Sequence, residues 1–224
     1  MERIADAFVW PSRDPQWLSK LLVVGLILII PIVGPINGLG WMLGALDRLR
    51  AGDEKLPPAN FDHLGRGFGL LVVFLVYYLV LGAVTSVIYI PALVILSAQG
   101  HDPSSPALVT LGVGLLLLAY SFMTLALLAV GFATPAIVLA FDAGGIGGGL
   151  NVRRVIRVAT ASPANTLIAG LMLIAAGIVG GLGLIVCVVG VYFTQAYALA
   201  MQAWIIRSFE LGSKEVTDAR RATA

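Results

Sequence analysis

Long apolar runs alternate with short polar stretches along this chain, and the pattern predicts membrane helices. The apolar runs cover residues 18–46, 68–98, 107–140 and 164–206. An α-helix crosses the hydrocarbon core of a bilayer in about 20 residues. The last run is therefore long enough for two crossings and each middle run for one. The first is too long for one clean span and short for two. The pattern predicts an all-α integral membrane protein.

Helix breakers divide the first and last runs. Proline removes a backbone donor and disfavours helix in the residue before it. The segment Ile30-Pro31-Ile32-Val33-Gly34-Pro35 therefore predicts two short helices over 18–47, either spanning fully or re-entrant. A single kinked span is the alternative, and the distribution of positive charge argues against it. In the last run, Gly180-Gly181-Leu182-Gly183 is the natural turn.

These breaks predict about six transmembrane or re-entrant helices in three hairpins. The hairpins cover 18–47, 68–140 and 164–206, and together they form one polytopic membrane domain over residues 18–206. Residues 1–17 are predicted to form an N-terminal interfacial helix, and residues 207–224 a polar cytoplasmic tail.

Two segments have the pattern of amphipathic helices lying in the headgroup layer. In residues 1–10, one helical face gathers Ile4, Phe8 and Val9, and Pro11 is expected to end the helix. In residues 151–159, one side gathers Val152, Val155, Ile156 and Ala159. The other side carries Arg153, Arg154 and Arg157, which we expect to face water or lipid phosphate. These three arginines are the candidate lipid-headgroup residues.

The positive charges support this topology. All 14 Lys and Arg fall in the polar stretches 1–20, 47–66, 141–160 and 207–224. Three hairpins place all four stretches on one side of the membrane. Lys and Arg are enriched in cytoplasmic loops. The sequence therefore predicts a multi-pass protein of the cell (inner or plasma) membrane with both termini cytoplasmic.

Composition agrees with lipid as the solvent of this chain. Hydrophobic residues make up 59% and charged residues 12%, whereas a soluble domain carries roughly 25% charged residues. A net charge of +2 gives no reason to expect nucleic acid. Cys187 is the only cysteine, so the chain forms no intramolecular disulfide, and we expect a small buried side chain there.

Ionisable residues deep in an apolar run would indicate an ion or substrate path, and the sequence has none. Asn37, Gln195 and Gln202 are the intramembrane polar candidates. Hydrogen bonding between helices is their usual role, and a polar ligand pathway is the alternative. His63 and His101 are predicted on opposite sides of the membrane. No metalloprotease or nucleophile-elbow motif occurs. We therefore expect no catalytic residue, no cofactor and no metal site.

Several short motifs follow one another in the N-terminal third. They are Asp14-Pro15-Gln16-Trp17, Ile30-Pro31-Ile32-Val33-Gly34, Leu56-Pro57 and Phe61-Asp62. In this order they resemble an uncharacterised family of prokaryotic polytopic membrane proteins, a domain of unknown function. The resemblance covers roughly residues 8–210. Such families usually have Trp soon after the Leu-Pro, where this chain has Pro58-Ala59-Asn60-Phe61. The resemblance implies membrane class and brings no established activity.

Two hypotheses of function follow. The first is a non-enzymatic membrane subunit or scaffold that associates with itself or with a larger membrane complex through helix contacts. Small residues four apart, such as Gly34/Gly38 and Gly40/Gly44, allow close helix approach. The expected partners are the lipid bilayer, a second copy of the chain or other membrane subunits. The alternative is a small transporter, channel or lipid-handling protein. An enzyme acting on lipid ranks third.

Overall fold

The protein is an all-α membrane protein. A computed structural model describes residues 3–98, 105–186 and 188–222, and this part of the chain contains helices and no strand. Three helices are long and apolar enough to cross a membrane, namely Leu64–Ala98, Pro106–Leu150 and Pro163–Ile185. Trp17–Leu28 is a shorter apolar helix. These helices confirm the predicted fold class, while the count of six membrane segments stays a prediction.

The elements are the 3₁₀ helices η1 (Ile4–Phe8) and η2 (Trp10–Arg13), followed by α1 (Trp17–Leu28), α2 (Val33–Arg50), α3 (Leu64–Ala98), α4 (Pro106–Leu150), α5 (Val152–Ala161), α6 (Pro163–Gly181), α7 (Gly183–Val186) and α8 (Gly190–Ala222). The longest described connection, residues 51–63, lies between α2 and α3. The chain divides into two compact units. We call residues 1–73 with 131–224 the core unit, and residues 74–130 the hairpin unit.

The helix break expected around Pro31 is present. Helix α1 ends at Leu28 and α2 begins at Val33, and between them Ile32 has a φ of 67°. A Cβ added to Gly34 would lie 2.5 Å from the Ile27 carbonyl oxygen. Glycine is therefore required for the two helices to approach so closely. Whether this pair spans the bilayer or re-enters stays a prediction.

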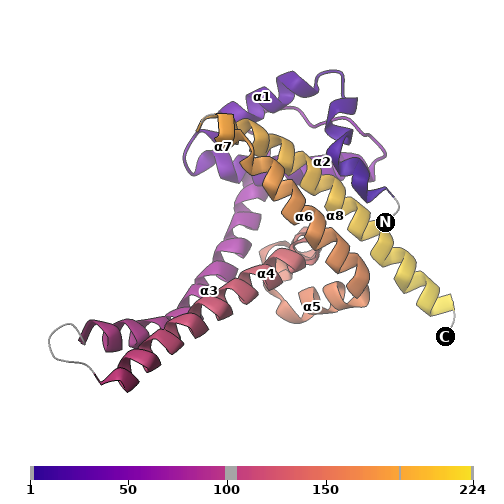
Figure 1. The fold of residues 1–224 in the computed structure, drawn as a ribbon. Helices are drawn as coiled ribbons and strands as arrows, with labels where there is room; N and C mark the ends of the chain where they lie inside the picture. Colours follow the sequence, from indigo (N-terminus) through magenta and orange to yellow (C-terminus); the bar gives the residue numbers. More distant parts are fainter. Residues whose placement is uncertain (1–2, 99–104, 187, 223–224) are drawn as a thin grey trace. The chain divides into compact units, whose positions relative to one another are not determined.

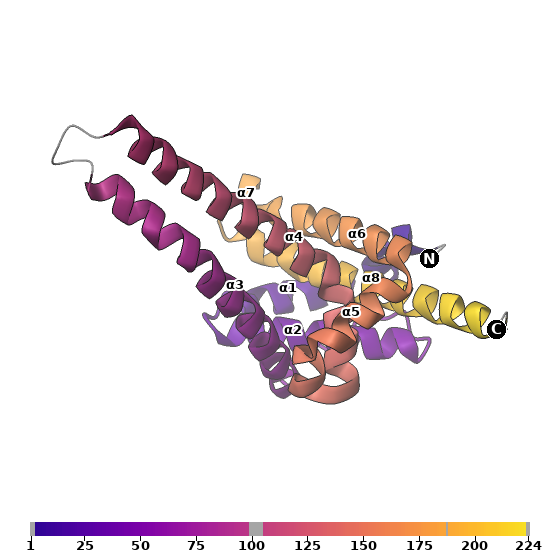
Figure 2. The ribbon, with the colours of Figure 1, turned by 90° about the horizontal axis from the view of Figure 1, so that it is seen from below.

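Helix α8 is the element on which most of the core unit packs. It lies beside α6 (Figures 1 and 2) and also contacts α1, α2 and η1. The core is made by large side chains without solvent exposure, among them Trp41, Leu43, Met201, Ile205 and Phe209. Burying such side chains contributes about 1.5–3 kcal/mol each. The apolar faces of α2 and α8 therefore stabilise the core unit together.

The N-terminal segment forms two 3₁₀ helices, which corrects the expectation of one amphipathic helix ended by Pro11. Pro11 lies in the first turn of η2, where its missing N–H costs nothing because that donor has no helical partner. The Trp10 ring stacks on Trp204 of α8, with ring centroids 5.6 Å apart. The Trp204 indole N–H donates to the Arg3 carbonyl oxygen at 2.8 Å. Placement of this segment in the headgroup layer stays a prediction.

Helix α4 is interrupted near its end. Gly144 and Gly145 have non-helical backbone angles, and Gly145 has a φ of 60°. Asn151 then begins α5, because its side-chain oxygen accepts a hydrogen bond from the Arg154 backbone N–H at 3.0 Å. This is the usual role of Asn at a helix N-cap. We call residues 144–149 the glycine segment. This segment connects the long apolar helix to the short amphipathic one and changes the direction of the chain between them.

The hairpin unit consists of the end of α3 and the start of α4, lying side by side (Figures 1 and 2). Tyr89 and Tyr120 meet edge to face with ring centroids 6.2 Å apart. The Thr85 hydroxyl donates to the Met123 sulfur at 3.5 Å. Gly112 packs so tightly that an added Cβ would lie 2.7 Å from the Leu96 side chain. Interhelical contacts of this kind hold membrane helices together.

Three of the sequence expectations concern residues outside the described part of the chain. The placement of His101 and of Cys187 lies there, as does the last part of the predicted 207–224 tail.

Candidate functional site

Arg50, at the end of α2, joins three helices through ion pairs. Its Nε donates to Glu210 Oε2 of α8 at 2.9 Å, and its Nη1 donates to Asp142 Oδ2 of α4. The Glu210 side chain is 13% exposed. Charges this far from water need partners, because desolvation penalises each of them. The ends of α2, α4 and α8 therefore meet at one charged cluster.

Four further side chains extend this cluster. Arg66 of α3 donates to Asp142 at 2.8 Å and also to Asp47. On the other side, Arg207 and Lys214 donate to Glu210 at 2.9 and 3.0 Å. Each of Asp142 and Glu210 thus serves more than one cation. We call Asp47, Arg50, Arg66, Asp142, Arg207, Glu210 and Lys214 the charged cluster.

Ion pairing keeps Glu210 and Arg50 ionised. Burial alone would raise the pKa of Glu210, but hydrogen bonds from Arg50, Lys214 and Arg207 outweigh it, so the pKa is lowered. Burial opposes the charged form of Arg50 as well, and its bonds to Asp142 and Glu210 raise its pKa above the ordinary value. A carboxylate that accepts charge-assisted hydrogen bonds is held in its ionised form.

A cavity of about 630 Å³ opens beside the charged cluster, entirely within the core unit. Its polar lining comes from Arg50, Asp142, Arg154, Glu210, Ser213 and Lys214. Its apolar lining includes Val158 and Ala161 of α5. Small-molecule sites in proteins occupy roughly 300–1,000 Å³. The cavity therefore has the size and the mixed lining of a ligand site.

Arg154 is the cation of this cavity that lacks an acidic partner among the described side chains. It sits against the glycine segment, since a Cβ added to Gly144 would lie 3.1 Å from its Nη1 and one added to Gly148 3.7 Å away. The glycines leave the space that the guanidinium occupies. Their role here is to accommodate a charged group, in addition to turning the chain.

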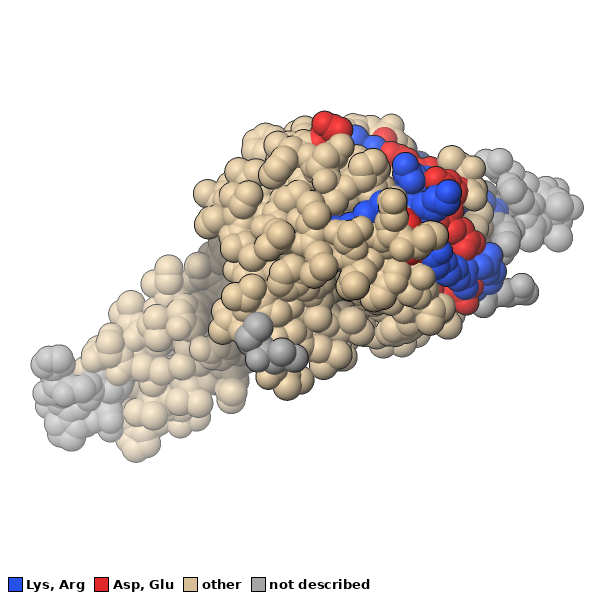
Figure 3. Space-filling model, turned by 90° about the horizontal axis from the view of Figure 1, so that it is seen from above, with Lys and Arg blue, Asp and Glu red and all other residues tan. Residues whose placement is uncertain are grey.

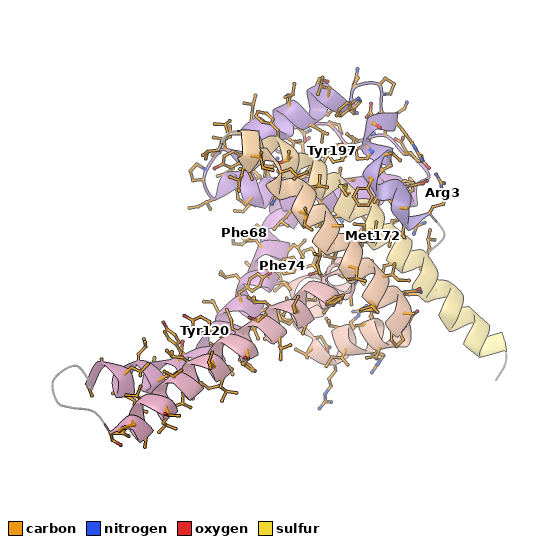
Figure 4. All side chains as sticks on the ribbon, in the orientation of Figure 1. Arg3, Phe68, Phe74, Tyr120, Met172 and Tyr197 are labelled. Atoms are coloured by element: carbon orange, nitrogen blue, oxygen red, sulfur yellow. The ribbon has the colours of Figure 1, made fainter. Side chains whose placement is uncertain are left out.

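The three candidate lipid-headgroup arginines do not share one face. Arg154, Val158 and Ala161 follow a helical spacing along the cavity side of α5. Arg153 and Arg157 are exposed next to the exposed apolar side chains of Val152 and Ile156. Nitrogen-tipped side chains extend outward from α5 in Figure 4. The helix therefore offers one arginine to the cavity and two to the surroundings.

The structure places Asn37 in a structural contact. It is fully buried, and its Nδ2 donates to the Asn60 carbonyl oxygen at 2.9 Å. One turn further along α2, the buried Trp41 indole donates to the Pro57 carbonyl oxygen. Both side chains therefore hold the loop that follows α2 against that helix. Asn37 is not among the residues that line the cavity beside the charged cluster.

Gln195 and Gln202, the other two polar candidates, come together at a second cavity. This cavity has a volume of about 290 Å³ and lies between α1, α2 and α8. Its α8 side is formed by Tyr192, Gln195, Leu199 and Gln202, and its other side by Leu28, Pro35 and Leu39. The spacing of the α8 residues places them on one helical face. The lining is largely apolar, with two carboxamides.

The N-terminal motif residues meet in space. Asp14 is buried and accepts hydrogen bonds from Lys20 Nζ at 2.7 Å and from the Leu56 backbone N–H at 3.0 Å. Burial would raise the pKa of Asp14, but the bonds from Lys20 and from backbone N–H groups lower it. The Asp-Pro and Leu-Pro motifs are therefore two halves of one structural contact.

A second group of charges lies on the surface of the core unit. Arg13 pairs with Glu54 at 2.8 Å and with Asp6 at 3.0 Å, and Arg3 pairs with Asp6 as well. Figure 3 views the molecule from above and shows basic and acidic side chains gathered along one edge. The rest of the face seen there is mostly uncharged. Exposed ion pairs contribute at most about 1 kcal/mol each. Because Glu54 lies in the loop after α2, we assign this group to holding the N-terminal segment on that loop.

No group of three or more His, Cys, Asp or Glu side chains that could hold a metal ion occurs in the part of the chain that the structure describes. The charged cluster contains carboxylates, but each is occupied by arginine or lysine. The cluster is therefore a network of ion pairs with four basic and three acidic side chains.

The chain belongs to a family described as Protein of unknown function (DUF4013), whose model matches residues 23–189. The predicted resemblance to a domain of unknown function is thereby confirmed. No curated protein and no solved structure matches the chain. The matched residues include α5 and the glycine segment, whereas Asp14 and Glu210 lie outside them.

Sequence reasoning missed the charged cluster. Asp47 and Asp142 were visible as charges at the ends of apolar segments, and Arg50 was visible as part of a basic stretch. Their meeting depends on contacts across 92 and 160 positions of sequence, which no local pattern reports. The one available signal was topological, because three hairpins bring the polar ends of all segments to one side.

Proposed function

We propose that the protein is a non-enzymatic membrane subunit that works through helix contacts with copies of itself or with a larger membrane complex. The observation that carries the proposal is the exposure of two long apolar helices. In their most apolar windows, α3 has 6% of residues buried and α4 has 11%. Nearly all of this surface is offered to lipid or to other helices.

The exposed side chain of Tyr120 is an argument for a neighbouring helix, rather than lipid alone, beside α4. Its side chain is 61% exposed, and its hydroxyl has no hydrogen-bond partner among the described residues. It lies about 21 Å along α4 from Pro106, within the roughly 30 Å of a hydrocarbon core. An unpaired hydroxyl in an apolar medium costs about 2–7 kcal/mol. An acceptor on a neighbouring helix would remove that cost.

The proposal places the protein in the cell (inner or plasma) membrane of a prokaryote, with both termini cytoplasmic. The support is the confinement of all 14 Lys and Arg to four polar stretches, combined with the enrichment of these residues in cytoplasmic loops. The charged cluster and the cavity beside it then face the cytoplasmic side, where soluble anions and lipid headgroups are both available.

The test is the mass of the particle released gently from its native membrane in a lipid nanodisc. We expect more than one polypeptide per particle. Tyr120→Phe is expected to reduce the assembled fraction. Tyr197→Phe is the matched control, because its hydroxyl donates within the chain to the Phe8 carbonyl oxygen at 2.6 Å. A particle that holds a single chain would contradict the proposal.

A transporter or lipid-handling protein is the second candidate, and the two cavities favour it. The smaller one has Gln195 and Gln202 on its α8 face. Transport of a polar solute through liposomes that is lost in Gln195→Leu and kept in Leu199→Ala would support this candidate. Unchanged flux in both variants would show that the solute does not pass through the smaller cavity.

A further inference from the structure

We propose that the cavity of about 630 Å³ beside the charged cluster binds a phosphate-bearing anion, with Arg154 as its principal ligand. Arg50 and Lys214 are the other cations of the lining. Two sources share this chemistry, the phosphate of an anionic lipid headgroup and free phosphate in solution. The experiment below distinguishes them.

Charge balance supports an anion. The charged cluster and Arg154 together hold five basic side chains against three acidic ones, a formal charge of +2. Arg50 is shared between Asp142 and Glu210, and Lys214 is engaged by Glu210. Arg154 carries one of the two positive charges left over, and it lines the cavity. A ligand of opposite charge would neutralise it.

Arg154 is held in position for such a ligand. Its backbone lies in the first turn of α5, whose N-cap is the Asn151 side chain. Its guanidinium rests against Gly144 and Gly148, and larger residues there would crowd it. A guanidinium presents several N–H donors in a planar fork that matches two phosphate oxygens. Little side-chain freedom then remains to be lost when the anion binds.

The position of the cavity on α5 fits a headgroup as well as a free anion. One face of α5 lines the cavity with Arg154, Val158 and Ala161. The neighbouring face exposes Val152 and Ile156, the kind of apolar face that an interfacial helix buries at the boundary of headgroups and acyl chains. A phosphate at the level of this helix would lie within reach of the cavity, with its acyl chains directed toward lipid.

This inference does not rest on the subunit role. A single-chain particle that binds phosphate contradicts only the subunit proposal. A multi-chain particle without affinity for phosphate contradicts only the anion site.

The test uses the full chain in an uncharged detergent, titrated separately with dihexanoyl phosphatidic acid, with inorganic phosphate and with dihexanoylglycerol, which lacks phosphate. Arg154→Gln is the variant and Arg153→Gln is the matched control, one position away and exposed. We expect wild type to bind phosphatidic acid and not dihexanoylglycerol. Arg154→Gln is expected to weaken binding about tenfold or more and Arg153→Gln less than about twofold, because only Arg154 donates charge-assisted hydrogen bonds to the anion in the cavity.

Each outcome is decisive. Binding of phosphatidic acid alone identifies a lipid headgroup, and binding of inorganic phosphate as well identifies a site for the free anion. Equal weakening by Arg153→Gln and Arg154→Gln would show general attraction to a basic surface and overturn the proposal, as would absence of binding by wild type. Lys214→Gln provides a second variant should Arg154→Gln fail to fold. Its side chain is 65% exposed, and an affinity equal to wild type would overturn the proposal.

Discussion

Arg50 and Glu210 are ion-paired at 2.9 Å although 160 positions of sequence separate them. The pair connects the C-terminal end of α2 to α8, and Asp142 brings the end of α4 to the same guanidinium. Removing Arg50 would leave two half-buried carboxylates with fewer partners. Arg50 therefore holds the ends of α2 and α4 against α8 within the core unit.

Arg50→Gln is expected to lower the free energy of unfolding by about 2 kcal/mol, because breaking a partly buried ion pair leaves uncompensated charge. Thermal unfolding in detergent measures the change. Arg48→Gln is the control, since its pair with Asp53 is more exposed, and a loss below about 1 kcal/mol is expected there. A double-mutant cycle with Glu210→Gln should show coupling between the two positions. Additive losses would refute the pairing.

Two glycines at the start of α3 should respond oppositely to alanine. A Cβ at Gly67 would lie 1.8 Å from the Ile36 carbonyl oxygen, whereas one at Gly65 meets nothing within 4 Å. Gly67→Ala is expected to destabilise the protein by about 1–3 kcal/mol through overpacking against α2. Gly65→Ala should be neutral or stabilise by up to about 1 kcal/mol. Chemical denaturation measures the free energy of unfolding of both variants. Similar changes in the two would mean that α2 and α3 are not in close contact.

Asp14→Asn should disconnect the N-terminal segment from the loop after α2. The change removes the ion pair with Lys20 and weakens the bond to the Leu56 N–H. A loss of about 2 kcal/mol is expected, since hydrogen bonds to charged groups contribute about 1.5–3 kcal/mol. Asp53→Asn, in an exposed pair, serves as the control. Limited proteolysis near residues 51–63 should accelerate in Asp14→Asn alone, and unchanged cleavage would contradict the contact.

His63 predicts a dependence of stability on pH. Burial lowers its pKa from the ordinary value of 6.5, and the ring lies against Gly44 with Nε2 buried. Below pH 6.5 the unfolded chain binds a proton that the folded chain does not. Stability contributed by His63 is therefore fully present above that pH and declines below it, until the folded pKa is reached.

Unfolding midpoints measured from about pH 8 to about pH 5 test this dependence. His63→Phe keeps a flat ring in the same space, and it should flatten the decline. Asp14 and Glu210, whose pKa values are lowered by folding, contribute further loss only as the pH falls toward and below their ordinary pKa values of 3.8 and 4.5. An equally steep decline in His63→Phe would assign the effect to another group.

Local sequence patterns predicted the helices well because apolar runs and proline breaks act over a few residues. The ends of α1 and α2 around Pro31 and the amphipathic α5 follow directly from such patterns. The two 3₁₀ helices η1 and η2 did not follow from the sequence pattern, because Pro11 is equally consistent with ending one helix and with beginning another.

The candidate site depended on longer-range packing. Arg154 was identified as one of three basic residues, but its distinct orientation depends on Gly144 and Gly148 leaving room beside it. Asn37 was singled out for polarity inside an apolar run. Its partner is a backbone carbonyl 23 positions away, in a loop whose path the sequence pattern did not specify.

The position of α8 in the sequence, after the elements that pack on it, has a consequence for synthesis. The N-terminal segment, α1 and α2 all pack on a helix that the ribosome makes well after them. Phe8 and its partner Tyr197 are 189 positions apart, which takes about 10–40 s to translate at 5–20 residues per second. During that interval the early helices lack their packing neighbour. The protein therefore assembles its core only after α8 has been made, and a nascent chain stalled before α8 should be an early substrate for membrane quality-control proteases.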